Sequence, residues 1–114
     1  MDLKSDKKQN VTILRLKEKR IDSKLSSDLK AHLLYLAKEN VENVLIDMAS
    51  VEYVDSSGLG AILFGVRQYR AIQGKLKIAN VQPRVLSLIR IAKLENVIES
   101  YDNEEEAVAS FESA

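Results

Sequence analysis

Cysteine is absent from this sequence of 114 residues, and histidine occurs once, as His32. The absence of cysteine excludes disulfides, thiol catalysis and iron–sulfur chemistry, and it fits a reducing compartment. A single histidine cannot build a zinc site without unusual help from carboxylates, so we expect no metal site. Because His32 falls within a predicted helix, we interpret it as a surface or half-buried helix residue.

Long apolar runs and an excess of charge are also missing. No apolar run approaches the length of a membrane span, and the charged N-terminal segment lacks the apolar region of a signal peptide. Seventeen basic and seventeen acidic residues cancel, so no overall field attracts nucleic acid or anionic lipid. We therefore expect a cytoplasmic protein with no membrane insertion and no direct contact with nucleic acid.

The charges are nevertheless distributed unevenly along the chain. Residues 1–20 hold seven bases and three acids, whereas beyond Lys93 there are seven acids and no base. Solvated faces are the simpler interpretation, and a polar contact between proteins is the functional one. The sequence leaves open whether the two segments meet within one fold or between neighbouring molecules.

The fold class follows from the alternation of apolar runs with helical stripes. The length and a hydrophobic content of 46% suit one domain, residues 1–114, with its own core. Apolar runs predict strands at 11–16, 44–46, 76–78 and 97–101, with a weaker edge strand at 3–6. Strands that alternate with helices favour an α/β fold with a mostly parallel sheet covered by helices.

Four helices are expected between and after these strands. Apolar residues at helical spacing mark the inward faces, and Ser26 or Ser27 is a suitable N-cap for the first helix. Gly74 is expected at the C-cap of the second helix, Pro83 in the first turn of the third, and Glu104–Glu106 in the first turn of the last. The inward positions are Leu29, Leu33 and Leu36; Leu59, Ile62, Leu63, Val66, Tyr69 and Ile72; Val85, Leu88, Ile89 and Ala92; and Val108 and Phe111.

Several kinds of enzyme chemistry lack their motifs. Gly58 and Gly60 begin a dinucleotide-like pattern, but Leu63 stands where the third glycine is required. No phosphate-binding loop of the G-x-x-x-x-G-K-[ST] type occurs. Neither Ser56 nor Ser57 has the glycine two residues earlier that a nucleophile elbow needs. We expect no catalytic residue and no cofactor.

The most informative segment is Val54–Gly60, between a short apolar run and the second predicted helix. Ser56 or Ser57 can serve as the N-cap, with Asp55 adding favourable charge, and such a cap contributes roughly 0.5–2 kcal/mol. The functional alternative is a phosphate acceptor, because the loop after a strand is where partners usually meet an α/β fold. Phosphorylation would add about −1.5 to −2 charges and weaken a partner packed over the turn.

The order of elements and the segment Tyr53–Gly60 resemble the STAS domains of bacterial anti-sigma factor antagonists. Agreement continues through Gly74-Lys75-Leu76 and the leucine-rich segment after Pro83, so the resemblance covers nearly the whole chain. It implies a single STAS-like domain with a four- to five-stranded, mostly parallel sheet, an edge strand and about four helices.

The resemblance also implies a partner-switching regulator. In that family the unphosphorylated antagonist binds an anti-sigma factor that is also a serine kinase, and so frees a sigma factor for transcription. The kinase phosphorylates the serine after the motif's aspartate, here Ser56 with Ser57 as second choice, and a PP2C-type serine phosphatase removes the phosphate. The chain would then be a substrate and ligand, not an enzyme.

The partner surface implied by the resemblance has two parts. One is the turn and the start of its helix, namely Asp55, Ser56, Ser57, Gly58 and Leu59. The other is Asp22, which matches the last residue of the family's G-[ED]-[LI]-D pattern and could equally be a cap near the following turn. Lys19 and Arg20 replace that pattern's glycine and acid, which makes this edge basic.

Two other functions remain open. A small STAS protein can be an accessory subunit of an ABC-type lipid transporter, and Ser56 can simply be a cap in a constitutive scaffold. The intact Asp-Ser-Ser turn favours the antagonist, because an accessory subunit has no evident use for a phosphate acceptor. Neighbouring genes would discriminate, since a kinase or phosphatase supports the antagonist and a permease with an ATPase supports the transporter.

Overall fold

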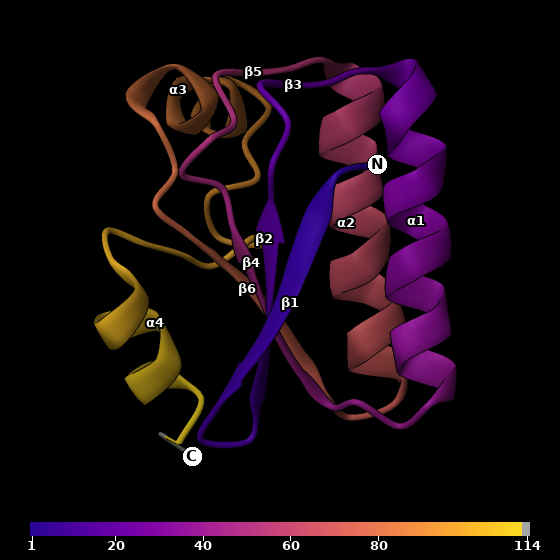
Figure 1. Cartoon of the computed structure of the whole chain (residues 1–114). Helices are drawn as coiled ribbons and strands as arrows, with labels where there is room; N and C mark the ends of the chain where they lie inside the picture. The colour runs from indigo at the N-terminus through magenta and orange to yellow at the C-terminus, as the bar shows by residue number, and fades with distance from the viewer. Residues whose placement is uncertain (113–114) are drawn as a thin grey trace.

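A five-stranded sheet with helices on both faces forms the framework of the computed structural model, which describes residues 1–112 (Figure 1). The last two residues of the predicted domain, 113–114, lie outside the described part. The strands are β1 (Leu3–Lys8), β2 (Val11–Leu16), β3 (Arg20–Ile21), β4 (Asn43–Asp47), β5 (Tyr53–Val54), β6 (Lys75–Ala79) and β7 (Ser100–Tyr101). The helices are α1 (Ser23–Lys38), α2 (Ser56–Ala71), α3 (Pro83–Ile91) and α4 (Glu104–Ser110).

The main sheet has the order β1-β2-β4-β6-β7. Strand β1 pairs with β2 in antiparallel fashion, and the remaining neighbours are parallel. This confirms the predicted α/β class, the mostly parallel sheet and the edge strand. Strand β1 is longer than predicted, since it pairs from Leu3 opposite Leu16 to Lys8 opposite Val11.

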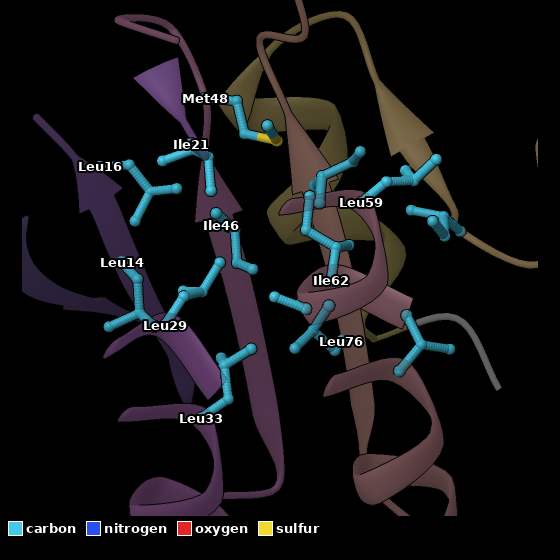
Figure 2. Close-up of a cluster of buried hydrophobic side chains, with 14 of the residues drawn as sticks. Leu14, Leu16, Ile21, Leu29, Leu33, Ile46, Met48, Leu59, Ile62 and Leu76 are labelled. Atoms are coloured by element: carbon cyan, nitrogen blue, oxygen red, sulfur yellow. The ribbon is translucent and has the colours of Figure 1, made fainter. Parts of the chain in front are cut away.

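Helices cover the two faces of the sheet unequally. Helices α1 and α2 pack side by side on one face, and α4 lies on the other (Figure 1). The larger core lies beneath α1, α2 and α3, and Figure 2 shows its side chains converging from the strands and helices. A smaller core joins β2, β4 and β6 to Val108 of α4 and to Phe111, the C-cap of α4; both were predicted to face inward.

Both predicted N-caps of the long helices are wrong by a few residues. Helix α1 begins at Ser23, where the carboxylate of Asp22 accepts hydrogen bonds from the backbone N–H groups of Lys24 and Leu25. Ser26 is buried within the first turn, and its hydroxyl donates to the carbonyl of Ser23. Aspartate and serine are comparable N-caps, so residue type alone could not show which of Asp22, Ser26 and Ser27 caps the helix.

The C-terminus of α2 also differs from the prediction at Gly74. The left-handed residue is Gln73, with φ of 60°, and the N–H of Gly74 donates to the carbonyl of Tyr69 at 2.7 Å. This is a Schellman motif in which Gly74 follows the left-handed position. Glycine is needed there because a Cβ would lie 2.4 Å from the carbonyl oxygen of Glu42.

Two short features were not predicted correctly. Strands β3 and β5 form a separate parallel pair, and β7 contains only Ser100–Tyr101 of the predicted strand 97–101. Residues 97–98 belong instead to the turn that follows α3, where the N–H groups of Val97 and Ile98 donate to the carbonyl of Leu94. The carbonyl of Glu99 accepts from the N–H of Ile78 in β6.

The basic N-terminal and acidic C-terminal segments meet within this fold. Glu104, at the start of α4, accepts from Lys8 at 2.6 Å and from Arg15 at 2.5 Å. Arg15 also donates to Asp6 and Asp47. These ion pairs between the basic and the acidic segment therefore hold α4 against the β1–β2 hairpin.

Candidate functional site

The small β3–β5 sheet brings two distant segments together at one end of the molecule. Arg20 is opposite Tyr53 and Ile21 is opposite Val54, and the N–H of Asp55 donates to the carbonyl of Ile21 at 3.2 Å. Helices α1 and α2 start directly after these strands, so their N-termini lie side by side at the top of Figure 1. The two parts of the predicted partner surface are therefore neighbours.

Asp55 is the N-cap of α2, which corrects the prediction that Ser56 or Ser57 holds this position. Its Oδ1 accepts the backbone N–H of Gly58 at 2.9 Å and the hydroxyl of Ser57 at 2.6 Å. The hydrogen bond from Ser57, followed by that from Gly58, lowers the pKa of Asp55 below its ordinary value. The backbone of Ser23, at the start of α1, lowers it further. Asp55 is thus held as a carboxylate.

Asp22 caps α1, as one of its two sequence-based interpretations predicted. Its Oδ1 accepts from the backbone N–H groups of Lys24 at 3.1 Å and Leu25 at 3.3 Å. The side chain is half-buried and remains at the surface beside Asp55. The cap does not conflict with a contact to a partner, and that contact stays a prediction.

Ser56 and Ser57 differ sharply although they are adjacent. Ser56 is the exposed first residue of α2, and its hydroxyl makes no hydrogen bond to any group within residues 1–112. Ser57 is half-buried and its hydroxyl is bound to Asp55. Ser56 is therefore the more exposed of the two serines.

Gly58 and Leu59 support the turn from beneath. A Cβ on Gly58 would lie 2.5 Å from the carbonyl oxygen of Ile21, so only glycine allows α2 to approach β3 this closely. Leu59 is 7% exposed, and its side chain belongs to the larger core (Figure 2). Both residues were predicted to contact a partner; the structure buries both, and that contact stays a prediction.

Sequence reasoning missed one part of this region. The guanidinium of Arg20 lies over the ring of Tyr53, 4.6 Å from its centroid. Two-residue strands are too short to show a period, so no signal in the sequence indicated that these side chains meet. The stack places a basic group beside the serine turn.

The functional groups at the turn are two serine hydroxyls and the carboxylate of Asp55. His32 lies on α1 and lines a different hollow, with Asp28 and Tyr35, so the turn has no imidazole to activate a serine. Within residues 1–112, no three histidine or acidic side chains gather as a metal site. In the same range no helix has the length and apolar character needed to cross a bilayer.

Comparison of sequences points to one family. The profile of the STAS domain matches residues 2–107. A putative anti-sigma factor antagonist of Bordetella bronchiseptica, BtrV, is 26% identical over 94 residues, which cover 82% of this chain and 81% of that protein. An anti-sigma F factor antagonist of Paenibacillus polymyxa is 27% identical over 77 residues, which cover 68% of this chain and 66% of that protein.

Solved structures show the same fold. A putative anti-sigma factor antagonist from Thermotoga maritima superimposes with a TM-score of 0.86 at 16% identity, covering 96% of this chain and 93% of that one. SpoIIAA in its unphosphorylated form gives 0.73 at 16% identity, with 96% of each chain covered. The Bacillus SpoIIAA in its phosphorylated form gives 0.72 at 18% identity, covering 96% of this chain and 98% of that one.

Proposed function

This chain belongs to the STAS domain family, and on that premise we propose that it is an anti-sigma factor antagonist controlled by phosphorylation. In its unphosphorylated state it binds an anti-sigma factor that is also a serine kinase, and thereby frees a sigma factor for transcription. The names of its relatives support the antagonist class, and one structural neighbour is known in a phosphorylated form.

The observation that carries the proposal is the exposed hydroxyl of Ser56 beside the fixed carboxylate of Asp55. The kinase transfers the γ-phosphoryl group of ATP to Oγ of Ser56, and ADP and a proton leave. A PP2C-type phosphatase hydrolyses the ester and returns serine and inorganic phosphate. The chain itself is substrate and ligand, and the catalytic groups belong to its partners.

Electrostatics explains how one phosphate releases the partner. It adds about −1.5 to −2 charges at neutral pH next to the Asp55 carboxylate. The start of α2 tolerates the added charge, because a helix N-terminus favours anions. A protein packed over the turn must instead desolvate the phosphate. A loss of about 2.7 kcal/mol weakens the complex roughly 100-fold, which is enough for a switch.

Affinity capture with variants of the full chain tests this function. We expect Ser56→Ala to retain its partner and to resist phosphorylation, and Ser56→Asp to bind more weakly, although one charge imitates phosphate only partly. Ser5→Ala is the matched control, since it removes an exposed hydroxyl on strand β1 and leaves the serine turn unchanged. Captured proteins and phosphopeptides are identified by mass spectrometry.

The outcomes separate the competing functions. Equal recovery of every partner by the Ala and Asp baits contradicts the switch, and recovery of a permease with an ATPase supports the lipid-transporter role. A phosphopeptide confined to Ser57 moves the acceptor by one residue.

A further inference from the structure

A groove of about 300 Å³ lies beside the serine turn, between β5 and α3. We call it the α3 groove. Its lining includes Tyr53, Val54, Arg84, Val85, Leu88 and Ile91. Val54 is followed directly by Asp55 and Ser56, so the groove and the turn form one continuous surface.

The groove has an apolar floor and an unusually exposed apolar rim. Val54 and Val85 are buried, and Leu88 is half-buried. Ile91, the last residue of α3, is 78% exposed, more than any other large hydrophobic residue in the described part of the chain. Apolar surface around a hollow is typical of a protein-binding site, whereas isolated exposed apolar residues are common.

The rim of the groove is basic. Arg84 lines the groove, and none of the described residues that line it is acidic. Arg20 adds a second guanidinium, stacked on Tyr53. Within residues 1–112, neither arginine has a carboxylate at ion-pair distance. A stacked guanidinium keeps its N–H edge available for a carboxylate.

We propose that the α3 groove is the second half of the anti-sigma factor binding surface and that it takes an acidic segment of that protein carrying one large apolar side chain. The apolar side chain enters between Leu88 and Ile91, and its acidic neighbours pair with Arg20 and Arg84. This inference rests on the proposed function. An acidic segment in the groove also increases the loss of affinity on phosphorylation, because a phosphate on Ser56 would repel the negative charge of the partner.

Photo-crosslinking in the bacterium that carries the chain tests the surface with the full protein. The probe is p-benzoylphenylalanine at three exposed positions: Ser23 beside the turn, Ser87 in the groove, and Ala109 on α4 across the sheet as a control. We expect the probes at 23 and 87 to link the kinase that phosphorylates Ser56, and the probe at 109 not to link it. The peptide linked at position 87 should contain Asp or Glu beside a large apolar residue.

Affinity measurements with that purified kinase give a second readout. Ile91→Ser and Arg84→Glu should each weaken binding about 10-fold or more, as expected for central residues of an interface. Tyr35→Ser is the matched control, because Tyr35 is 60% exposed on α1, away from the groove. Circular dichroism is used to check that each variant is folded.

The results separate the two proposals. A kinase linked at position 23 but not at 87, or unchanged affinity of both groove variants, overturns the α3 groove and leaves the proposed function standing. No kinase linked at either position overturns both. A different protein linked at position 87, or a linked peptide without acidic residues, overturns the stated occupant.

Discussion

The hydroxyl of Ser57 donates a hydrogen bond of 2.6 Å to Oδ1 of Asp55. This bond distinguishes the two serines of the Asp-Ser-Ser turn. Ser57 fixes the carboxylate that caps α2, and the neighbouring Ser56 is left exposed. Two serines that look equivalent in the sequence therefore have different environments, and each is open to a separate test.

We predict that Ser57→Ala raises the pKa of Asp55 toward its ordinary value, because it removes the largest cause of the lowering. A carboxylate with a lowered pKa in the folded state contributes stability above its ordinary pKa, and that contribution disappears as the pH falls through the lowered value. The acid sensitivity that comes from Asp55 should therefore be smaller in this variant than in the native chain. Carbon-13 NMR of the side-chain carboxyl measures the pKa directly.

The control for this measurement is Ser56→Ala, which removes a hydroxyl that does not bind Asp55. An equal change of the Asp55 pKa in both variants would show that the bond from Ser57 is not its main cause.

The order of the helices and of the longer strands could be predicted because each of them has a visible pattern. Strand β4 is a continuous apolar run, as burial on both faces requires. The apolar stripe of α2 is regular and includes the buried Tyr69, but Ile72 at its end, predicted to face inward, is exposed. The predicted N-caps were wrong because an aspartate precedes the predicted serine in both helices: Asp55 lies one residue before Ser56, and Asp22 lies four residues before Ser26. All of these residues are good caps.

The arrangement of the candidate site could be predicted only in part. The acceptor turn is a local motif, so Asp55 and Ser56 were found from the sequence. The contact of Arg20 with Tyr53 depends on pairing between β3 and β5. That pairing accompanies the packing of α1 against α2, which is a contact between distant segments. Strands of two residues are too short to show it as a pattern in the sequence.

The two glycines of the turn should respond in opposite ways to alanine. Gly58→Ala forces a Cβ to within 2.5 Å of the backbone of Ile21, so it should destabilise the fold and separate α2 from β3. Gly60→Ala meets nothing within 4 Å and should stabilise α2 by roughly 0.5–1 kcal/mol. Urea unfolding of both variants measures the difference. Stability gained by Gly58→Ala would contradict the close approach described here.

Two substitutions of Asp55 should distinguish its role as a helix cap from the role of its negative charge. Asn is about as good a cap as Asp, so Asp55→Asn should preserve most of the stability, whereas Asp55→Ala should lose roughly 0.5–2 kcal/mol. Asn keeps an acceptor oxygen for the N–H of Gly58 but has no negative charge. A loss of kinase binding in Asp55→Asn at unchanged stability would therefore assign the carboxylate to the partner contact. Equal binding by both folded variants and the native chain would remove Asp55 from that surface.

Glu104 should make the attachment of α4 sensitive to acid. Hydrogen bonds from Arg15 and then Lys8 lower its pKa to about 2. Because this pKa is lowered in the folded state, the stability that Glu104 contributes is present above its ordinary pKa of 4.5 and is lost as the pH falls toward about 2. Glu104→Gln should cost about 1.5–3 kcal/mol near neutral pH, the range for hydrogen bonds to charged groups, and less at about pH 3. Urea unfolding at both pH values measures this, with the exposed Glu105→Gln as the matched control. An equal cost at both pH values would mean that the carboxylate's charge is not what holds α4 to the hairpin.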